Sequence, residues 1–330
     1  MIELFGTLGP SCSDSETLQT MFENGMSGMR LNLSHTGLAE SSELIHRFQK
    51  AAEAAGVAPE LLIDLQGPEL RVNRLAAPLE LSEGSTLPLS ELPVPDVVMN
   101  ALEDGNELLL DDGKLLLKLN GGSLTILRGG TLQSRKSVKI KDKSVPMPAL
   151  TETDRLNLSL AVSHGVSAVM QPFVRSAQDI ETVRAALKEN NAEQIRIFSK
   201  IENREGLSRI DEIIQSSDMI VIARGDLGND IPLPELPGVQ KDIAAKCRAA
   251  KVPFLVVTQM LTSMINNPVP TRAEVSDIFN AVTDGASAVM VTNETAVGSY
   301  PAEVIRIMKE TTDAAEHWLQ TKRGCKKTSD

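Results

Sequence analysis

Two neighbouring apolar runs, each ending in charged residues, decide how this chain folds: Gln194-Ile-Arg-Ile-Phe-Ser-Lys-Ile-Glu-Asn203 and Ser217-Asp-Met-Ile-Val-Ile-Ala-Arg-Gly-Asp-Leu-Gly228. Each run is typical of a buried parallel strand, and the helical spacing of apolar residues in 204–216 predicts a crossover helix between them. Lys200, Glu202 and Asp226 are therefore expected at the carboxyl ends of strands, where parallel α/β sheets form their sites. Two carboxylates beside a lysine predict a Mg²⁺ site suited to an oxyanion or a phosphoryl group. A single Lys-x-Glu is also typical of a surface ion pair.

The same strand and helix alternation extends along most of the chain. Ser13-x-x-Glu16, Thr151-x-x-Asp154 and Thr271-x-x-Glu274 have the spacing of capping boxes at helix starts, and a last amphipathic helix is expected from Pro301 through Trp318. Eight strand and helix units predict a closed (β/α)₈ TIM barrel with its site at the carboxyl ends of the strands. The expected strands cover residues 2–9, 28–35, 60–64, 166–174, 194–203, 217–228, 253–259 and 287–294.

The pattern changes after the third predicted strand. Short apolar runs are separated there by glycine-containing turns such as Glu83-Gly84-Ser85, Asp104-Gly105-Asn106 and Asn120-Gly121-Gly122. Such turns connect antiparallel hairpins. We therefore expect a small β domain at residues 72–140, inserted into a barrel formed by residues 1–71 and 141–330.

Composition narrows the class of protein further. Aromatic residues make up only 3% of the 330 residues, so the core must be aliphatic, which suits strands buried on both faces. The net charge of −11 disfavours binding to nucleic acid or anionic membranes, and no apolar stretch approaches the roughly twenty residues that span a bilayer. The three cysteines are widely spaced and the start lacks a secretory signal, so we expect a cytoplasmic protein.

Several motifs, taken in order, resemble those of the pyruvate kinase family. The resemblance covers nearly the whole barrel. The motifs are Gly28-Met-Arg-Leu-Asn-Leu-Ser-His35, Ile63-Asp-Leu-Gln-Gly-Pro-Glu-Leu-Arg71, Ser199-Lys-Ile-Glu-Asn203, Ala223-Arg-Gly-Asp-Leu-Gly228, Thr258-Gln-Met with Pro270-Thr-Arg-Ala-Glu274, and Asn293-Glu-Thr-Ala296.

The resemblance implies roles for the residues at the strand ends. Glu202 and Asp226 would hold Mg²⁺ or Mn²⁺, and Lys200 with Arg30 would stabilise the phosphoryl group in transfer. Thr258 would lie near the methylene carbon that gains a proton. The backbone N–H groups of Gly225 and Asp226 would bind the substrate carboxylate.

The resemblance also implies a K⁺ site and a nucleotide site. Glu69 is typical of family members that require K⁺, so we expect K⁺ dependence. The ADP phosphates would contact His35, Arg71 and Lys136. The K⁺ ligands would be Asn32, Ser34, Asp64 and the carbonyl oxygen of Leu65.

The sequence departs from the family pattern at a few positions. Leu65-Gln66 stands where Thr-Lys is usual, and Pro172 replaces a serine. The sequence stops after the eighth barrel helix, so we expect no effector site of the kind carried by the family's carboxyl-terminal domain. Residues 260–270 and the helix from Thr271 resemble a subunit contact region, which implies a homo-oligomer, a dimer or a tetramer.

The expected activity is phosphoryl transfer from phosphoenolpyruvate to ADP, which yields pyruvate and ATP. One alternative keeps the metal and enolate chemistry without the nucleotide, as in an oxaloacetate decarboxylase or an aldol lyase. Another is a non-catalytic sensor of phosphoenolpyruvate or a 2-oxo acid. Lys200 favours the kinase over the sensor, because a sensor has no need of a cation at the transferring group.

Overall fold

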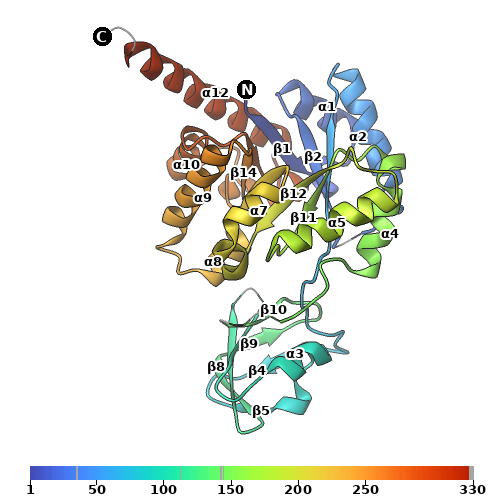
Figure 1. Cartoon of the computed structure of the whole chain (residues 1–330), viewed down its shortest axis with the longest axis vertical. Coiled ribbons are helices and arrows are strands. Elements are labelled where there is room, and N and C mark those ends of the chain that lie inside the picture. Colours follow the sequence, from blue (N-terminus) through green and yellow to red (C-terminus); the bar gives the residue numbers. More distant parts are fainter. Residues whose placement is uncertain (35, 112, 142, 144, 327–330) are drawn as a thin grey trace. The chain divides into compact units, whose positions relative to one another are not determined.

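The chain folds into two compact units (Figure 1), seen in a computed structural model that describes residues 1–34, 36–111, 113–141, 143 and 145–326. The first unit comprises Met1–Gly67, Ala149–Leu227 and the segment from Pro234 onward. The second comprises Pro68–Pro148 and Gly228–Leu233. The domain boundaries expected from the sequence, 1–71 with 141–330 and 72–140, remain a prediction about separately folding domains.

The first unit contains a closed barrel of parallel strands, which confirms the predicted fold class. β3 pairs with β11 across the insertion through Asp64 and Met170, and β15 closes the barrel on β1 through Ala288 and Glu3. The strands are β1 (Glu3–Thr7), β2 (Gly28–Asn32), β3 (Glu60–Asp64), β11 (Ala168–Gln171), β12 (Arg196–Ile201), β13 (Met219–Ala223), β14 (Phe254–Val257) and β15 (Ala288–Met290).

Helices surround this barrel (Figure 1). Short 3₁₀ turns lie at Pro10–Cys12, Val162–His164 and Thr262–Ile265. The α-helices are α1 (Ser15–Glu23), α2 (Ser42–Ala54), α4 (Glu152–Leu160), α5 (Ala177–Glu189), α6 (Arg204–Ser208), α7 (Ile210–Ser216), α8 (Arg224–Asp230), α9 (Leu236–Ala250), α10 (Arg272–Thr283), α11 (Asn293–Ala296) and α12 (Pro301–Lys326).

Three expectations about these elements were wrong in detail. The single crossover helix expected at 204–216 is two helices, because Arg209 leaves the helical conformation at φ −111° and ψ 21°. The strand expected to reach Gly228 ends at Ala223, since α8 begins at Arg224. The last helix continues beyond Trp318 to Lys326.

The helix caps follow the predicted chemistry at two of three places. Thr151 and Thr271 each accept a hydrogen bond from the backbone of the residue three positions later, and both capping boxes are complete. The box predicted at Ser13 is wrong. Asp14 is the cap instead, and its carboxylate accepts a hydrogen bond of 2.8 Å from the Thr17 N–H.

Alternation along the strands determines what lies inside the barrel. Every second side chain points inward, and the inward residues of all strands but β2 form one fully apolar buried cluster. Two positions after Leu62 and Phe198, the same faces carry Asp64 and Lys200. Polar groups therefore lie directly above the apolar core, at the carboxyl ends of the strands. The cluster is Phe5, Leu62, Ala168, Met170, Phe198, Met219, Val221, Ala223, Leu255, Val257, Ala288 and Met290.

The second unit consists of antiparallel sheets around its own aliphatic core, which includes Leu108, Leu117 and Leu124. Of the turns expected to connect hairpins, Asn120-Gly121-Gly122 joins an antiparallel pair of neighbouring strands. The other two expectations were wrong, because Glu83-Gly84-Ser85 joins strands of two different sheets and Asp104-Gly105-Asn106 connects a helix to a strand. A short helix, α3 (Asp96–Ala101), was not expected. The strands are β4 (Leu79–Leu81), β5 (Thr86–Pro88), β6 (Glu107–Leu110), β7 (Leu115–Asn120), β8 (Ser123–Arg128), β9 (Gly130–Leu132) and β10 (Val138–Ile140), with a 3₁₀ turn at Leu89–Glu91.

Within the described ranges, the helices are either too short or too polar to cross a lipid bilayer.

Replacement of the cap of α1 tests the local structure. Asp14→Ala removes the acceptor for the Thr17 N–H and should lower the free energy of unfolding by about 0.5–2 kcal/mol. Ser13→Ala should change it by less than about 0.5 kcal/mol, because Ser13 does not cap α1 and its hydroxyl makes only an exposed hydrogen bond to the Pro10 carbonyl. Urea denaturation monitored by circular dichroism measures both values. A larger loss in Ser13→Ala than in Asp14→Ala would restore the capping box predicted from the sequence.

Candidate active site

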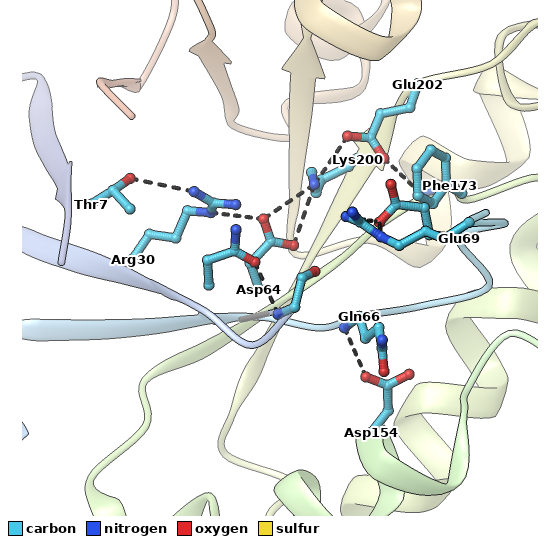
Figure 2. Close-up of polar contacts among 12 residues, drawn as sticks. Thr7, Arg30, Asp64, Gln66, Glu69, Asp154, Phe173, Lys200 and Glu202 are labelled. Carbon is cyan, nitrogen blue, oxygen red and sulfur yellow. Dashed lines mark hydrogen bonds and ion pairs between the residues drawn. The ribbon is translucent and has the colours of Figure 1, made fainter. Parts of the chain in front are cut away.

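Lys200 is the central residue of the candidate site (Figure 2). It follows the inward-facing Phe198 on β12, and its Nζ lies 3.0 Å from Glu202 Oε1 and 3.2 Å from Asp64 Oδ2. Only 13% of its side chain is exposed. Burial alone would lower the pKa of the ammonium, but the carboxylates of Asp64 and Glu202 raise it above its usual value. Lys200 therefore stays charged at every physiological pH.

Asp64 joins this lysine to a second cation. The Arg30 Nε donates a 2.7 Å hydrogen bond to Asp64 Oδ2, and the Arg30 guanidinium also reaches the hydroxyl of Thr7 at 3.5 Å (Figure 2). Burial would raise the pKa of Asp64, but Lys200 and Arg30 lower it below its usual value. The two cations that the sequence predicted for phosphoryl stabilisation thus share one buried carboxylate.

Glu202 is buried immediately after β12. Its Oε2 accepts a 2.8 Å hydrogen bond from the backbone N–H of Phe173, which has the uncommon positive φ of 52° (Figure 2). Burial raises the pKa of Glu202 to about 7, although Lys200 acts in the opposite direction. Asp226 contributes to the increase. The Phe173 N–H thus holds the Glu202 carboxylate in one orientation. Because its pKa is about 7, Glu202 gains or loses its proton near neutral pH.

Asp226 belongs to the same electrostatic cluster. Its charge raises the pKa values of both Lys200 and Glu202. Among the side chains that the structure describes, none donates a hydrogen bond to the Asp226 carboxylate or forms an ion pair with it. Gly225 and Asp226 lie in the first turn of α8, where backbone N–H groups have no partner inside the helix.

Thr258 follows β14 in a strained conformation. Its φ is +82° and that of Gln259 is +57°, values that a β-branched residue such as threonine rarely adopts. A Cβ added at Gly225 would lie 3.0 Å from Thr258 Cγ2 and 3.6 Å from its Oγ1. The Thr258 side chain therefore packs over the backbone of Gly225, and a larger residue there would displace it.

The oxygen donors present fit a hard divalent cation. Glu202 and Asp226 offer carboxylate oxygens, and Mg²⁺ is usually held by one or two carboxylates with water and substrate oxygens completing its shell. Nowhere in the described parts of the chain do three or more His, Cys, Asp or Glu side chains form a metal-binding group. Two protein carboxylates suit Mg²⁺ or Mn²⁺, because these ions commonly take their remaining ligands from water and substrate.

The residues expected to bind K⁺ are partly brought together. Asn32 lies opposite Asp64 in the β2 and β3 pairing, and its Oδ1 accepts a 3.1 Å hydrogen bond from the Ser34 N–H. The Leu65 N–H donates to the Met170 carbonyl, which fixes the peptide that follows Asp64. Because Asp64 also pairs with two cationic side chains, its role as a K⁺ ligand remains a prediction.

The residues expected to bind the nucleotide belong to the second unit or lie outside the described residues. Arg71 forms an ion pair of 2.6 Å with Glu69, and Lys136 forms one of 3.0 Å with Asp111. His35 lies outside the described residues. Nucleotide binding by all three remains a prediction.

Sequence reasoning missed the residues that hold the site loops. Asp154, which was assigned only to a helix cap, also accepts hydrogen bonds of 2.8 and 3.1 Å from the N–H groups of Gln66 and Gly67. It thereby anchors the loop that follows Asp64 (Figure 2). Phe173 was expected inside a strand, but β11 ends at Gln171. Neither contact leaves a periodic signal in the sequence, since each joins segments that are distant along the chain.

Comparison with known proteins agrees with this arrangement. The family model described as "Pyruvate kinase, barrel domain" matches residues 2–305. Proteins named "Pyruvate kinase" from Sporosarcina psychrophila and Geobacillus stearothermophilus are each 38% identical over 94% of this chain. The pyruvate kinase of Aeropyrum pernix is 37% identical over 97% of it.

The matched relatives are longer than this chain. The alignments cover 56% of the Sporosarcina protein, 57% of the Geobacillus protein and 72% of the Aeropyrum protein. The chain thus spans little more than half the length of the first two. Since the family match covers the barrel almost from end to end, this chain belongs to the pyruvate kinase family.

Proposed function

We propose that this protein transfers a phosphoryl group from phosphoenolpyruvate to ADP, with Mg²⁺ or Mn²⁺ and K⁺ as cofactors. The main support is the buried ammonium of Lys200, which lies within 3.2 Å of both Asp64, at the carboxyl end of β3, and Glu202, directly after β12. Phosphoryl transfer needs neutralised charge and alignment more than covalent help from the protein. A fixed cation over an apolar core supplies both.

The net charge of the cluster favours binding of a divalent cation first, and the positive charge that results then favours an anionic substrate. Arg30 and Lys200 are cationic, whereas Asp64, Glu202 and Asp226 are acidic, so the fully ionised cluster has a net charge of −1. The raised pKa of Glu202 indicates that a proton partly offsets this charge in the metal-free protein. A divalent ion in place of that proton would leave a positive site, which suits an anionic substrate.

In the proposed reaction, the bond from phosphorus to the enol oxygen of phosphoenolpyruvate breaks, and a bond from phosphorus to the terminal phosphate oxygen of ADP forms. Lys200 and Arg30 stabilise the negative charge on the transferring group. When bound by Glu202 and Asp226, the divalent ion supplies Lewis-acid stabilisation of the developing charge.

The remaining enolate takes up a proton at its methylene carbon and becomes pyruvate. Thr258 lies over the backbone of Gly225, so its hydroxyl is beside the first turn of α8. We assign the N–H groups of Gly225 and Asp226 to the substrate carboxylate and Thr258 to the protonation step. The two N–H groups and the Thr258 side chain are then held at fixed distances from the Asp226 carboxylate. The N–H groups belong to Gly225 and Asp226 themselves, and Thr258 packs on Gly225.

Further features of the proposal concern nucleotide, cation, assembly and location. Arg71, Lys136 and His35 are the proposed contacts of the ADP phosphates. Asn32, Ser34, Asp64 and Leu65 are the proposed K⁺ site. We also propose a cytoplasmic homo-oligomer that associates through barrel contacts.

Turnover is tested directly with phosphoenolpyruvate, ADP, Mg²⁺ and K⁺, with pyruvate measured by a coupled dehydrogenase. Lys200→Met should lower kcat by at least about 10²-fold, because one charge on the transferring group is lost. Lys241→Met is the matched control, since Lys241 pairs with Asp284 on the exposed surface and should leave kcat unchanged. Absence of turnover with any nucleoside diphosphate would refute the proposed activity.

Metal affinity should depend on pH through Glu202. Its pKa of about 7 means that protons compete with the cation below neutrality, so Mn²⁺ affinity should fall by up to about tenfold per pH unit below pH 7 and level off above it. Titration followed by electron paramagnetic resonance measures the free ion. Glu202→Gln should bind weakly and without this pH dependence. Equal affinity of the unmodified protein at pH 6 and pH 8 would contradict the assignment.

One observation favours a nucleotide-independent enolate enzyme as the second candidate. The proposed nucleotide contacts Arg71 and Lys136 already form ion pairs with Glu69 and Asp111. Incubation with oxaloacetate and Mg²⁺, but no nucleotide, tests this candidate. Release of carbon dioxide that disappears in Glu202→Gln but persists in Lys136→Met would support a decarboxylase. Absence of release would exclude the decarboxylase and leave the kinase as the proposed enzyme.

A further inference from the structure

The connection between β14 and α10 begins with two strained residues. Thr258 and Gln259 both have positive φ, at +82° and +57°. Residues other than glycine keep such angles only where their surroundings enforce them, and these residues often lie at functional sites. Some contact must therefore hold Thr258 in place.

That contact comes from Arg224, the first residue of α8. Its guanidinium donates two hydrogen bonds to the Thr258 carbonyl oxygen, of 2.7 Å from one terminal nitrogen and 3.2 Å from Nε. The other terminal nitrogen donates to Asp277 of α10, with distances of 2.8 and 2.7 Å to its two carboxylate oxygens. Only 12% of the Arg224 side chain is exposed. The planar guanidinium thus connects a fixed carboxylate to the strained peptide.

Arg224 also donates to the Met260 sulfur at 2.9 Å, but the loop beyond Met260 is anchored by different residues. Glu294 accepts a hydrogen bond of 3.3 Å from the Leu261 N–H, and Glu274 accepts one of 2.7 Å from the Ser263 N–H. These anchors act three or more positions after Thr258. Loss of Arg224 should therefore release Thr258, Gln259 and Met260 while the loop from Leu261 onward stays in place.

We propose that Arg224, held by Asp277, is a positioning residue that keeps the Thr258 hydroxyl in place over Gly225. This proposal rests on the proposed function, in which Thr258 serves the protonation of the enolate. Arg224 acts through the Thr258 carbonyl, and it is adjacent in sequence to Gly225, whose backbone the Thr258 side chain covers. Arg224 thereby fixes the Thr258 peptide through its guanidinium and the Gly225 backbone through the peptide bond between them.

The first test is structural and does not depend on activity. A crystal structure of Arg224→Gln should show Thr258 with a negative φ and its side chain moved away from Gly225. Arg196→Met is the matched control, because Arg196 pairs with Glu60 and stacks on Phe198 at the start of β12. It should leave Thr258 at its positive φ. A positive φ at Thr258 in Arg224→Gln, with the packing on Gly225 retained, would overturn the proposal.

The second test is a double-mutant cycle in the pyruvate-forming assay. Arg224→Gln should lower kcat by about tenfold to 10²-fold, as a displacement of about 1 Å at a reacting group does, with an unchanged KM for ADP. In a Thr258→Val background the same change should cost less than about threefold, because the hydroxyl it positions is gone. Additive losses would show that Arg224 acts independently of Thr258 and would overturn the proposal.

Two further variants separate positioning from general destabilisation. Asp277→Asn keeps a hydrogen-bond acceptor for Arg224, and Arg224→Lys keeps the charge without the paired donors, so both should give smaller losses of kcat than Arg224→Gln. Melting temperatures identify any variant that fails to fold. If the unmodified protein forms no pyruvate, the proposed function fails, whereas the φ of Thr258 in Arg224→Gln still decides the positioning role.

Discussion

A buried lysine that must stay charged is the constraint on which this site depends. The Lys200 ammonium lies above the apolar interior of the barrel, where an unpaired charge would cost far more than the fold can supply. Asp64 and Glu202 both form ion pairs with it. Because these are two negative charges against one ammonium, Arg30 supplies the second positive charge through its ion pair with Asp64. Removal of one member leaves another unpaired, so the cluster acts as a unit.

The barrel makes this cluster possible because it separates packing from chemistry. Inward positions such as Leu62 and Phe198 fill the core, and the next inward positions on the same strands present Asp64 and Lys200. The loops after β12 and β14 then add Glu202 and Thr258, and the first turn of α8 adds Asp226, without changing the packing below. Strain at Phe173 and Thr258 is confined to these loops, where hydrogen bonds to Glu202 and Arg224 accompany it.

Much of the fold could be predicted from the sequence, since the apolar runs fixed all eight barrel strands and the hairpin turns marked the insertion. The details that could not be predicted depend on which of several neighbouring residues makes a local backbone contact. Asp14 rather than Ser13 caps α1, and Arg209 interrupts the helix expected at 204–216. At the site, strand periodicity placed Lys200, and the motifs named Asp64 and Thr258. Contacts between distant segments, such as Asp154 with Gln66 or Arg224 with Thr258, leave no periodic trace and required the structure.

The central claim is that Glu202 and Asp226 share one divalent ion beside Lys200. Anomalous diffraction from a crystal soaked with Mn²⁺ and oxalate, which stands in for the enolate of pyruvate, tests it most directly. The account predicts one anomalous peak within coordination distance of a carboxylate oxygen of each residue, with oxalate and water oxygens as the remaining ligands. A peak bound by only one of the two carboxylates, or by neither, would contradict it.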